Sequence, residues 1–126
     1  MIVEPVLLRP FWVHVKNLLM RIIARSTLHS FVASLAGPKD QRAVKAALDS
    51  WFQEVRRARW ANTAEVKRRY ATASIVTSER IVFNIKGNSY RLIVAVDFEK
   101  SIVWIKWVGT YRDYDRVDAA KVKHAK

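Results

Sequence analysis

The sequence predicts an α+β fold in which N-terminal helices pack on a small antiparallel sheet. Three observations support this fold class. Helical periodicity dominates up to residue 73, strand-like runs follow it, and short turns separate those runs. Helices first and a meander of strands second is the order typical of helices covering one face of a sheet. With 126 residues, 51% of them hydrophobic, the chain fits one compact domain, and no internal repeat or linker interrupts it.

The first 19 residues are apolar, but we expect neither a membrane span nor a secretory signal in them. The run is broken by charged residues and prolines well before a length of about 18 apolar residues, the minimum for a membrane-spanning helix. No basic start and no small-residue cleavage site are visible. We therefore expect a cytoplasmic protein without a membrane partner, with residues 1–19 as an extension and residues 20–126 as one functional domain.

Residues 20–73 predict a short strand followed by three helices. Met20 opens a strand-like run, and Ser26 or Thr27 can cap a helix that continues to residue 36 and is stopped by Gly37-Pro38. From residue 39 to 59, apolar side chains recur at spacings of three and four, as on one face of a helix: Val44, Leu48, Trp51 and Val55. Asn62 or Thr63 can cap a third helix that ends at residue 70.

The second half predicts three strands and a last helix. The strands are expected at residues 80–86, 89–98 and 102–109, joined by turns at Gly87-Asn88 and Glu99-Lys100. The polar residues 111–120 are expected to form the final helix.

The first hairpin places two polar side chains opposite each other. Residues 82–94 read V-F-N-I-K-G-N-S-Y-R-L-I-V, and a turn at Gly87-Asn88 pairs Asn84 with Arg91. Side chains alternate between faces, so these two are expected on an open face with Arg80, Val82, Lys86, Ile93 and Trp104. A two-residue second turn would put Val108 opposite Arg91, bury Trp107, and carry Tyr111 and Arg112 toward Asn84 and Lys86.

Charge points to a polyanionic partner, and the composition argues against metal or thiol chemistry. The net charge is +12 and the pI is near 10.5, values typical of proteins that bind nucleic acid, anionic membranes or acidic proteins. There is no cysteine, the three histidines lack metal-ligand spacing, and three glycines cannot build a phosphate-binding loop. We expect no cofactor and no metal.

The cationic face suits RNA cleavage by transesterification. An arginine offers a planar fork of donors to a phosphate, a lysine adds a point charge, and an asparagine adds an amide. The RNA supplies its own nucleophile, the 2′-hydroxyl. The enzyme needs only to accept that proton, to stabilise the phosphorane charge and to protonate the leaving 5′-oxygen.

Three stretches resemble the HigB toxins of bacterial type II toxin–antitoxin systems, within the wider RelE-like group. They are R-W-A-N-T-A-E-V-K-R-R-Y (59–70), R-I-V-F-N-I-K-G-N-S-Y-R-L-I (80–93) and V-G-T-Y-R-D-Y-D (108–115). The resemblance implies a RelE-like ribonuclease fold and an endoribonuclease that cuts messenger RNA on the ribosome. It also implies a HigA-like helix-turn-helix antitoxin, through which alone operator DNA is contacted.

With the resemblance, nine residues become candidates for the site. Catalytic roles are expected for Arg91, Tyr111, Lys67 and Lys86, and RNA binding for Asn84, Arg68, Arg69, Arg112 and Trp104. One position departs from the family pattern, because Tyr111 stands where such toxins usually carry histidine. A tyrosine has an ordinary pKa of about 10, whereas histidine titrates near neutrality. Two alternatives therefore stay open: a non-catalytic nucleic-acid-binding module, and an inactive toxin relic that serves as an antitoxin partner or co-repressor.

Overall fold

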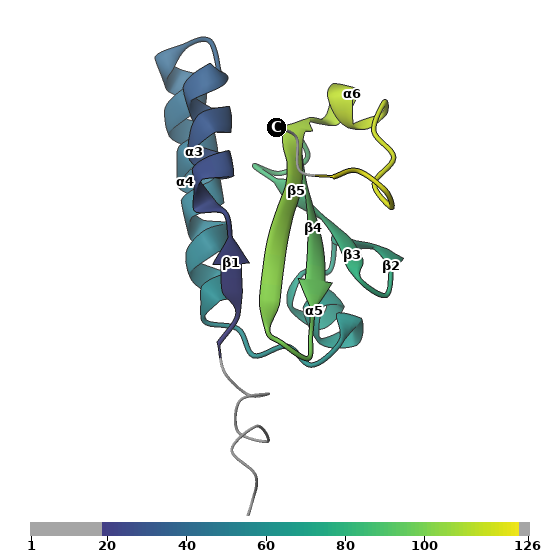
Figure 1. The fold of residues 1–126 in the computed structure, drawn as a ribbon. Helices are drawn as coiled ribbons and strands as arrows, with labels where there is room; N and C mark the ends of the chain where they lie inside the picture. Colours follow the sequence, from purple (N-terminus) through teal and green to yellow (C-terminus); the bar gives the residue numbers. More distant parts are fainter. Residues whose placement is uncertain (1–18, 124–126) are drawn as a thin grey trace, which may run out of the picture.

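The computed structural model describes residues 19–123, which form three N-terminal helices on one face of a five-stranded sheet and a short C-terminal helix beside it (Figure 1). This confirms the α+β class. The strands, with their bounds, are β1 (Arg21–Ile23), β2 (Ser74–Thr77), β3 (Arg80–Ile85), β4 (Tyr90–Asp97) and β5 (Ile102–Thr110). Their order in the sheet is β1-β5-β4-β3-β2. The expected extension, residues 1–19, lies outside the described residues except for Leu19.

The sheet is mixed rather than wholly antiparallel, because β1 pairs with β5 in parallel. The other three pairings are antiparallel. The sequence did not reveal β2, an edge strand of four mostly exposed residues without apolar alternation. Both edge strands are short, as natural sheet edges often are.

The helices follow the predicted pattern with shifted ends. They are α3 (Arg25–Ser34), α4 (Pro38–Arg56), α5 (Thr63–Arg69) and α6 (Tyr111–Tyr114). The cap predicted at Ser26 or Thr27 is wrong, because Ala24 precedes the first turn of α3 without a side-chain cap. Asn62 does cap α5: its side-chain oxygen accepts a hydrogen bond from the Glu65 backbone N–H at 3.0 Å. Within the described residues no helix is long and apolar enough to cross a membrane.

The main core lies between the sheet and α4. The apolar stripe of α4 is buried as its spacing predicted: Val44, Leu48, Trp51 and Val55. These side chains meet the face of β3 and β4 that carries Phe83 and Leu92, and the ring of Trp51 packs edge-on against Phe83 at 5.4 Å. Burial of this stripe determines which face of the hairpin points away from the helices.

The last predicted helix is wrong in extent. Residues 111–114 form one short helix, α6, and residues 115–123 continue as turns. This segment folds back beside the sheet (Figure 1). It covers a second, smaller apolar cluster of Val82, Ile93 and Ala119. The tail is therefore a cover for the sheet's other face rather than a free helix.

Candidate active site

The β3–β4 hairpin has the register that its sequence predicts. Asn84 pairs directly with Arg91, and Phe83 pairs with Leu92. The connection is a four-residue loop, residues 86–89, in which the Ser89 backbone N–H donates to the Lys86 carbonyl at 3.2 Å. Lys86 and Gly87 both have positive φ, 53° and 64°, so the loop turns tightly and leaves Lys86 exposed at the hairpin end.

The Arg91 side chain is held by this loop. Its Nη1 atom donates to the carbonyl oxygens of Asn88 at 2.9 Å and Tyr90 at 3.3 Å. The guanidinium carbon also lies 5.8 Å from the centre of the Tyr114 ring, within cation–π range. A guanidinium has five N–H donors, and both of these bonds use the same nitrogen. The loop thus orients the plane of the fork at the edge of the face it shares with Asn84.

Tyr111 reaches the same end of the sheet through its backbone. Its N–H donates to the Ser89 carbonyl at 3.1 Å, which joins the start of α6 to the hairpin loop. Thr110 caps α6 by accepting from the Asp113 N–H at 3.1 Å. Tyr111 is 47% exposed. Arg112, next in the chain, is also exposed.

The second hairpin contains a bulge that the sequence did not reveal. The pairing shifts by one residue between Ile93 and Val94, so that Arg91 faces Gly109 instead of the expected Val108. Beyond the bulge the expected register returns, with Asp97 opposite Ile102. Lys106 was expected opposite Ile93, and Trp107 takes that place.

Because of the bulge, Trp107 lies on the Arg91 face and not in the main core. Its ring packs against Tyr114, with centroids 6.4 Å apart. Gly109 makes room for it, since a β-carbon at that position would lie 2.5 Å from the indole ring. Trp107, Tyr114 and Arg91 therefore form one layered cluster, which sequence reasoning missed. A glycine two residues after a tryptophan in a strand is the signal that could have revealed it.

Part of the face expected to be open is covered. Val82 and Ile93 are buried beneath the tail rather than exposed. Arg80, expected on the same face, donates from Nη1 to the carbonyls of Ala119 at 3.1 Å and Val122 at 2.8 Å. The polar end of the face, at Asn84 and Arg91, lies outside the covered apolar cluster and is only half-buried.

The cations of α5 lie elsewhere. Figure 1 shows α5 at the opposite end of the sheet from α6. Lys67 donates to the carbonyls of Ala71 at 2.7 Å and Ala73 at 2.6 Å, so it closes the end of its own helix. Arg69 forms an ion pair with Glu54 at 3.4 Å, whereas Arg68 is exposed. The structure does not bring these three side chains together with Arg91.

Tyr70, at the end of α5, serves the packing of this helix. Its hydroxyl donates to Glu54 Oε1 at 2.5 Å, and its ring packs against Trp60 and Phe83. Burial and the hydrogen bond to Glu54 hold the pKa of Tyr70 far above its usual range. This tyrosine therefore stays protonated and belongs to the fold, not to acid–base chemistry.

Trp104 shares the Arg91 face, as predicted, but at a distance. It pairs with Ala95, four residues along β4 from Arg91, or about 13 Å at the rise of a strand. It lines a cavity of about 450 Å³ with the acidic residues Glu79, Asp97 and Glu99. A negative surrounding of this kind disfavours a phosphate backbone, so the expected stacking role gains no support from its position.

No group of three or more histidine, aspartate or glutamate side chains that could hold a metal ion is found in residues 19–123. The chemistry available at the hairpin end is that of cations, an amide and a phenol. Arg91, Lys86 and Arg112 supply positive charge, Asn84 supplies hydrogen bonds, and Tyr111 supplies a hydroxyl.

The chain matches a known protein family over most of its described length. A family model described as HigB_toxin, the RelE-like toxic component of a toxin–antitoxin system, matches residues 44–117. This range covers more than half of the 126 residues and includes every candidate site residue. No curated protein matches the chain in a sequence search.

Proposed function

Because this chain belongs to the HigB family of RelE-like toxins, we propose that it is a ribosome-dependent endoribonuclease that cleaves messenger RNA by 2′-hydroxyl transesterification. Family membership makes it the toxic component of a toxin–antitoxin pair and implies a cognate antitoxin. The observation that carries the proposed chemistry is the paired placement of Asn84 and Arg91 beside the backbone of Tyr111, at the open end of one sheet face.

Arg91 is proposed to stabilise the transition state. A phosphorane carries one more negative charge than the phosphate it forms from, so a fixed guanidinium gains interaction energy as the reaction proceeds. The bonds from Nη1 to Asn88 and Tyr90 hold the fork in place for the substrate. Lys86 and Arg112, both exposed at this end, are proposed to bind the flanking phosphates, and Asn84 to orient the RNA by hydrogen bonds.

Tyr111 is proposed to move a proton. Its hydroxyl is proposed to protonate the leaving 5′-oxygen as general acid. It takes the position where the family usually has histidine. The three cations of α5, all exposed, are proposed to contact RNA away from the cleaved bond: Lys67, Arg68 and Arg69.

The partners follow from the family. We propose that a HigA-like helix-turn-helix antitoxin neutralises the toxin in the cytoplasm, and that the pair contacts operator DNA through the antitoxin. The alternative of an inactive relic is favoured by one observation, the tyrosine at position 111. In that case the chain would bind its antitoxin but cleave nothing.

Replacement of Arg91 tests the proposed function. Arg91→Ala should lower cleavage of ribosome-bound mRNA by about 100- to 1,000-fold, as is typical when one transition-state donor is lost. Arg91→Lys should recover little, because a point charge does not reproduce a planar fork. Arg116→Ala, which removes the same charge from an exposed residue of the tail, is the matched control. Equal cleavage by Arg91→Ala and the parent would place the active face elsewhere.

A further inference from the structure

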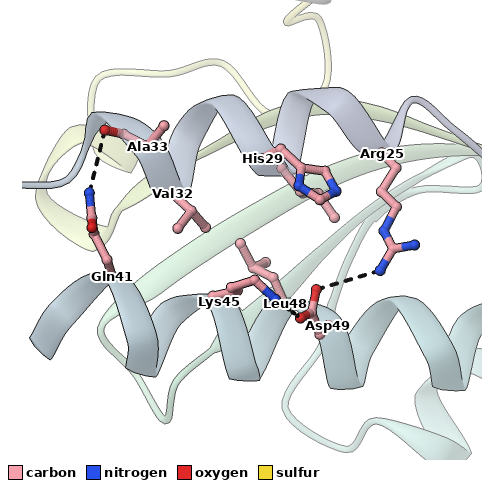
Figure 2. A pocket seen from close by; sticks show the side chains of 9 residues that line it. Arg25, His29, Val32, Ala33, Gln41, Lys45, Leu48 and Asp49 are labelled. Atoms are coloured by element: carbon pink, nitrogen blue, oxygen red, sulfur yellow. Dashed lines mark hydrogen bonds and ion pairs between the residues drawn. The ribbon is translucent and has the colours of Figure 1, made fainter. Parts of the chain in front are cut away.

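A groove between α3 and α4 lies apart from the candidate active site. The two helices run side by side (Figure 1) and enclose a space of about 300 Å³. Figure 2 shows Val32 of α3 and Leu48 of α4 in its walls, with Lys45, His29 and Arg25 along the rim. Leu28 of α3 also lines it. Gln41 closes one end, donating from Nε2 to the carbonyl of Leu35 at 2.9 Å. The groove is thus an apolar floor with a polar rim.

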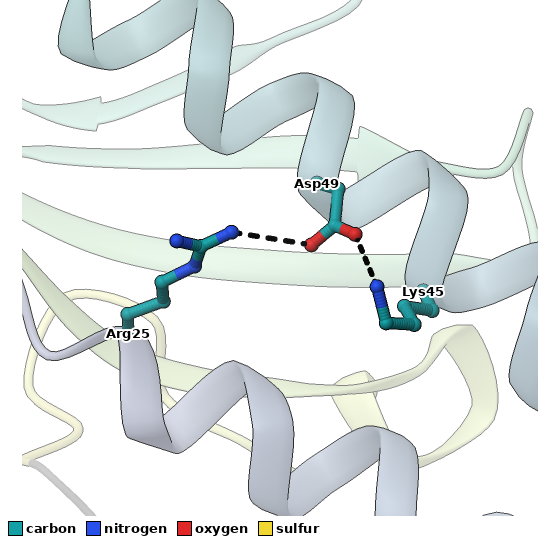
Figure 3. Close-up of polar contacts among 3 residues, drawn as sticks. All are labelled: Arg25, Lys45 and Asp49. Carbon is teal, nitrogen blue, oxygen red and sulfur yellow. Dashed lines mark hydrogen bonds and ion pairs between the residues drawn. The ribbon is translucent and has the colours of Figure 1, made fainter.

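The rim carries more positive than negative charge. Asp49 binds two cations, Lys45 Nζ at 2.7 Å and an Arg25 Nη atom at 3.7 Å, one at each carboxylate oxygen (Figure 3). The hydrogen bond from Lys45, with Arg25 and His29 nearby, holds the pKa of Asp49 below its usual range. Arg25 is also fixed over the ring of Phe52, at 4.2 Å. Because the rim holds two cations, Lys45 and Arg25, and one carboxylate, Asp49, its net charge is positive.

The groove and the candidate active site lie on different sides of the sheet, and one wall of the groove lies outside the segment that the family model matches. The helices pack on the sheet face that carries Phe83 and Leu92, and Arg91 lies on the other face. The family model matches residues 44–117, so α3, which forms one whole wall, lies outside the matched segment.

We propose that this groove is the docking surface for an acidic amphipathic segment of the cognate antitoxin. The apolar floor fits an apolar stripe of such a segment, in the way that helices bind in grooves. The cationic rim and the chain's net charge of +12 favour acidic flanks. Nucleic acid is the poorer occupant, because Leu28 and Leu48, at 4% and 1% exposed, give a floor without phosphate donors.

Two charge reversals on one helix test the proposal. Lys45→Glu changes the groove rim, and Arg42→Glu makes the same charge change at an exposed residue of α4 outside the groove. The full-length toxin is titrated with the antitoxin encoded in its own operon, at about 150 mM salt, where the Debye length is about 8 Å. Lys45→Glu is expected to weaken binding at least tenfold and Arg42→Glu less than twofold.

A steric pair repeats the test without charge. Ala33→Trp fills the groove from an exposed position of α3, and Ala46→Trp adds the same ring to an exposed position of α4 outside the groove. Only the first is expected to weaken the complex, while thermal unfolding shows that all four variants are folded. Equal losses within either pair, or no loss in the groove variants, would overturn the proposal.

Other occupants give different results. If deletion of residues 1–18 tightened antitoxin binding tenfold, that segment would be the occupant of the groove. If the toxin formed a dimer that Lys45→Glu disrupts and Arg42→Glu does not, a second copy of the chain would be the occupant. Either result overturns the proposal. The inference rests on the toxin–antitoxin role within the proposed function but not on ribonuclease chemistry. Because the readout is binding, a toxin that cleaves nothing gives the same groove result, and the two failures are distinguishable.

Discussion

Adding one methyl group at Gly109 should destabilise the protein and disturb the Arg91 site. Gly109 is buried in β5, directly opposite Arg91. A β-carbon built there would lie 2.5 Å and 2.6 Å from two atoms of the Trp107 indole. Carbon atoms pack at about 3.5–4.0 Å, so the ring would have to move by roughly 1 Å or more. Gly109→Ala therefore cannot be accommodated without displacing Trp107.

The cost follows from what Trp107 contacts. Its ring packs against Tyr114 and the small cluster beneath the tail, and overpacking of this kind costs about 1–3 kcal/mol. For a domain of this size each kcal/mol lowers the melting temperature by roughly 4 °C. Because the Arg91 guanidinium lies over the Tyr114 ring, we also expect slower mRNA cleavage by Gly109→Ala, beyond what the unfolded fraction explains.

A double-mutant cycle checks the cause. Urea unfolding is measured for Gly109→Ala, Trp107→Leu and the double variant. A smaller side chain at position 107 removes the clash, so Gly109→Ala should cost at least about 1 kcal/mol less in that background. Strict additivity would refute the steric argument, and so would a loss below about 0.5 kcal/mol for Gly109→Ala alone.

Three further predictions concern the tail, the groove and the proton donor. Arg80→Ala removes both hydrogen bonds to the tail carbonyls of Ala119 and Val122. It should lower the free energy of unfolding by about 1.5–3 kcal/mol and speed tryptic cleavage near Lys121. Arg112→Ala should have neither effect. Asp49→Asn should lower the free energy of unfolding by at most about 1 kcal/mol, because the ion pairs of Asp49 are partly exposed. The pKa of Asp49 is lowered in the fold, so its contribution to the free energy of unfolding is present above the ordinary aspartate pKa and is lost as pH falls. The free energies of unfolding of the parent and of Asp49→Asn should therefore differ at neutral pH and become equal in acid. Tyr111→Phe should reduce the rate of mRNA cleavage by about 100-fold or more. Tyr111→His should cleave at least as fast as the parent, with a changed pH profile. Primer extension on the cleaved mRNA measures both rates, and cleavage by Tyr111→His alone would identify the parent as a relic.

Local patterns made the first hairpin and α4 predictable. The turn at Gly87-Asn88, flanked by alternating side chains, is enough to pair Asn84 with Arg91, and the fold has that pairing. A slip of one residue would bury polar side chains, so the alternation permits little else. The stripe on α4 was predictable for the same reason. Both depend on residues close together in the chain.

What the sequence did not reveal depends on long-range packing. The run I-V-W-I-K-W-V in β5 is apolar on both faces, so no alternation marks the bulge or places Trp107 beside Arg91. The parallel pairing of β1 joins residues about 80 positions apart in the chain. Lys67 lies in a basic stretch whose sequence resembles the HigB family. Only the fold shows that its ammonium group is bound to the carbonyls of Ala71 and Ala73.

The chemistry of the cut tests the account most directly. Ribosomes are programmed with an mRNA that carries a single 2′-deoxy nucleotide immediately 5′ of the mapped cleavage position, and with the all-ribose mRNA as the matched control. If the RNA supplies the nucleophile to a site built on Arg91 and Tyr111, the purified toxin will cut the control and leave a 2′,3′-cyclic phosphate and a 5′-hydroxyl. The deoxy mRNA will stay whole at that position. Equal cutting of both messages, or 5′-phosphate ends, would contradict transesterification, and no cutting of either would contradict the ribonuclease itself.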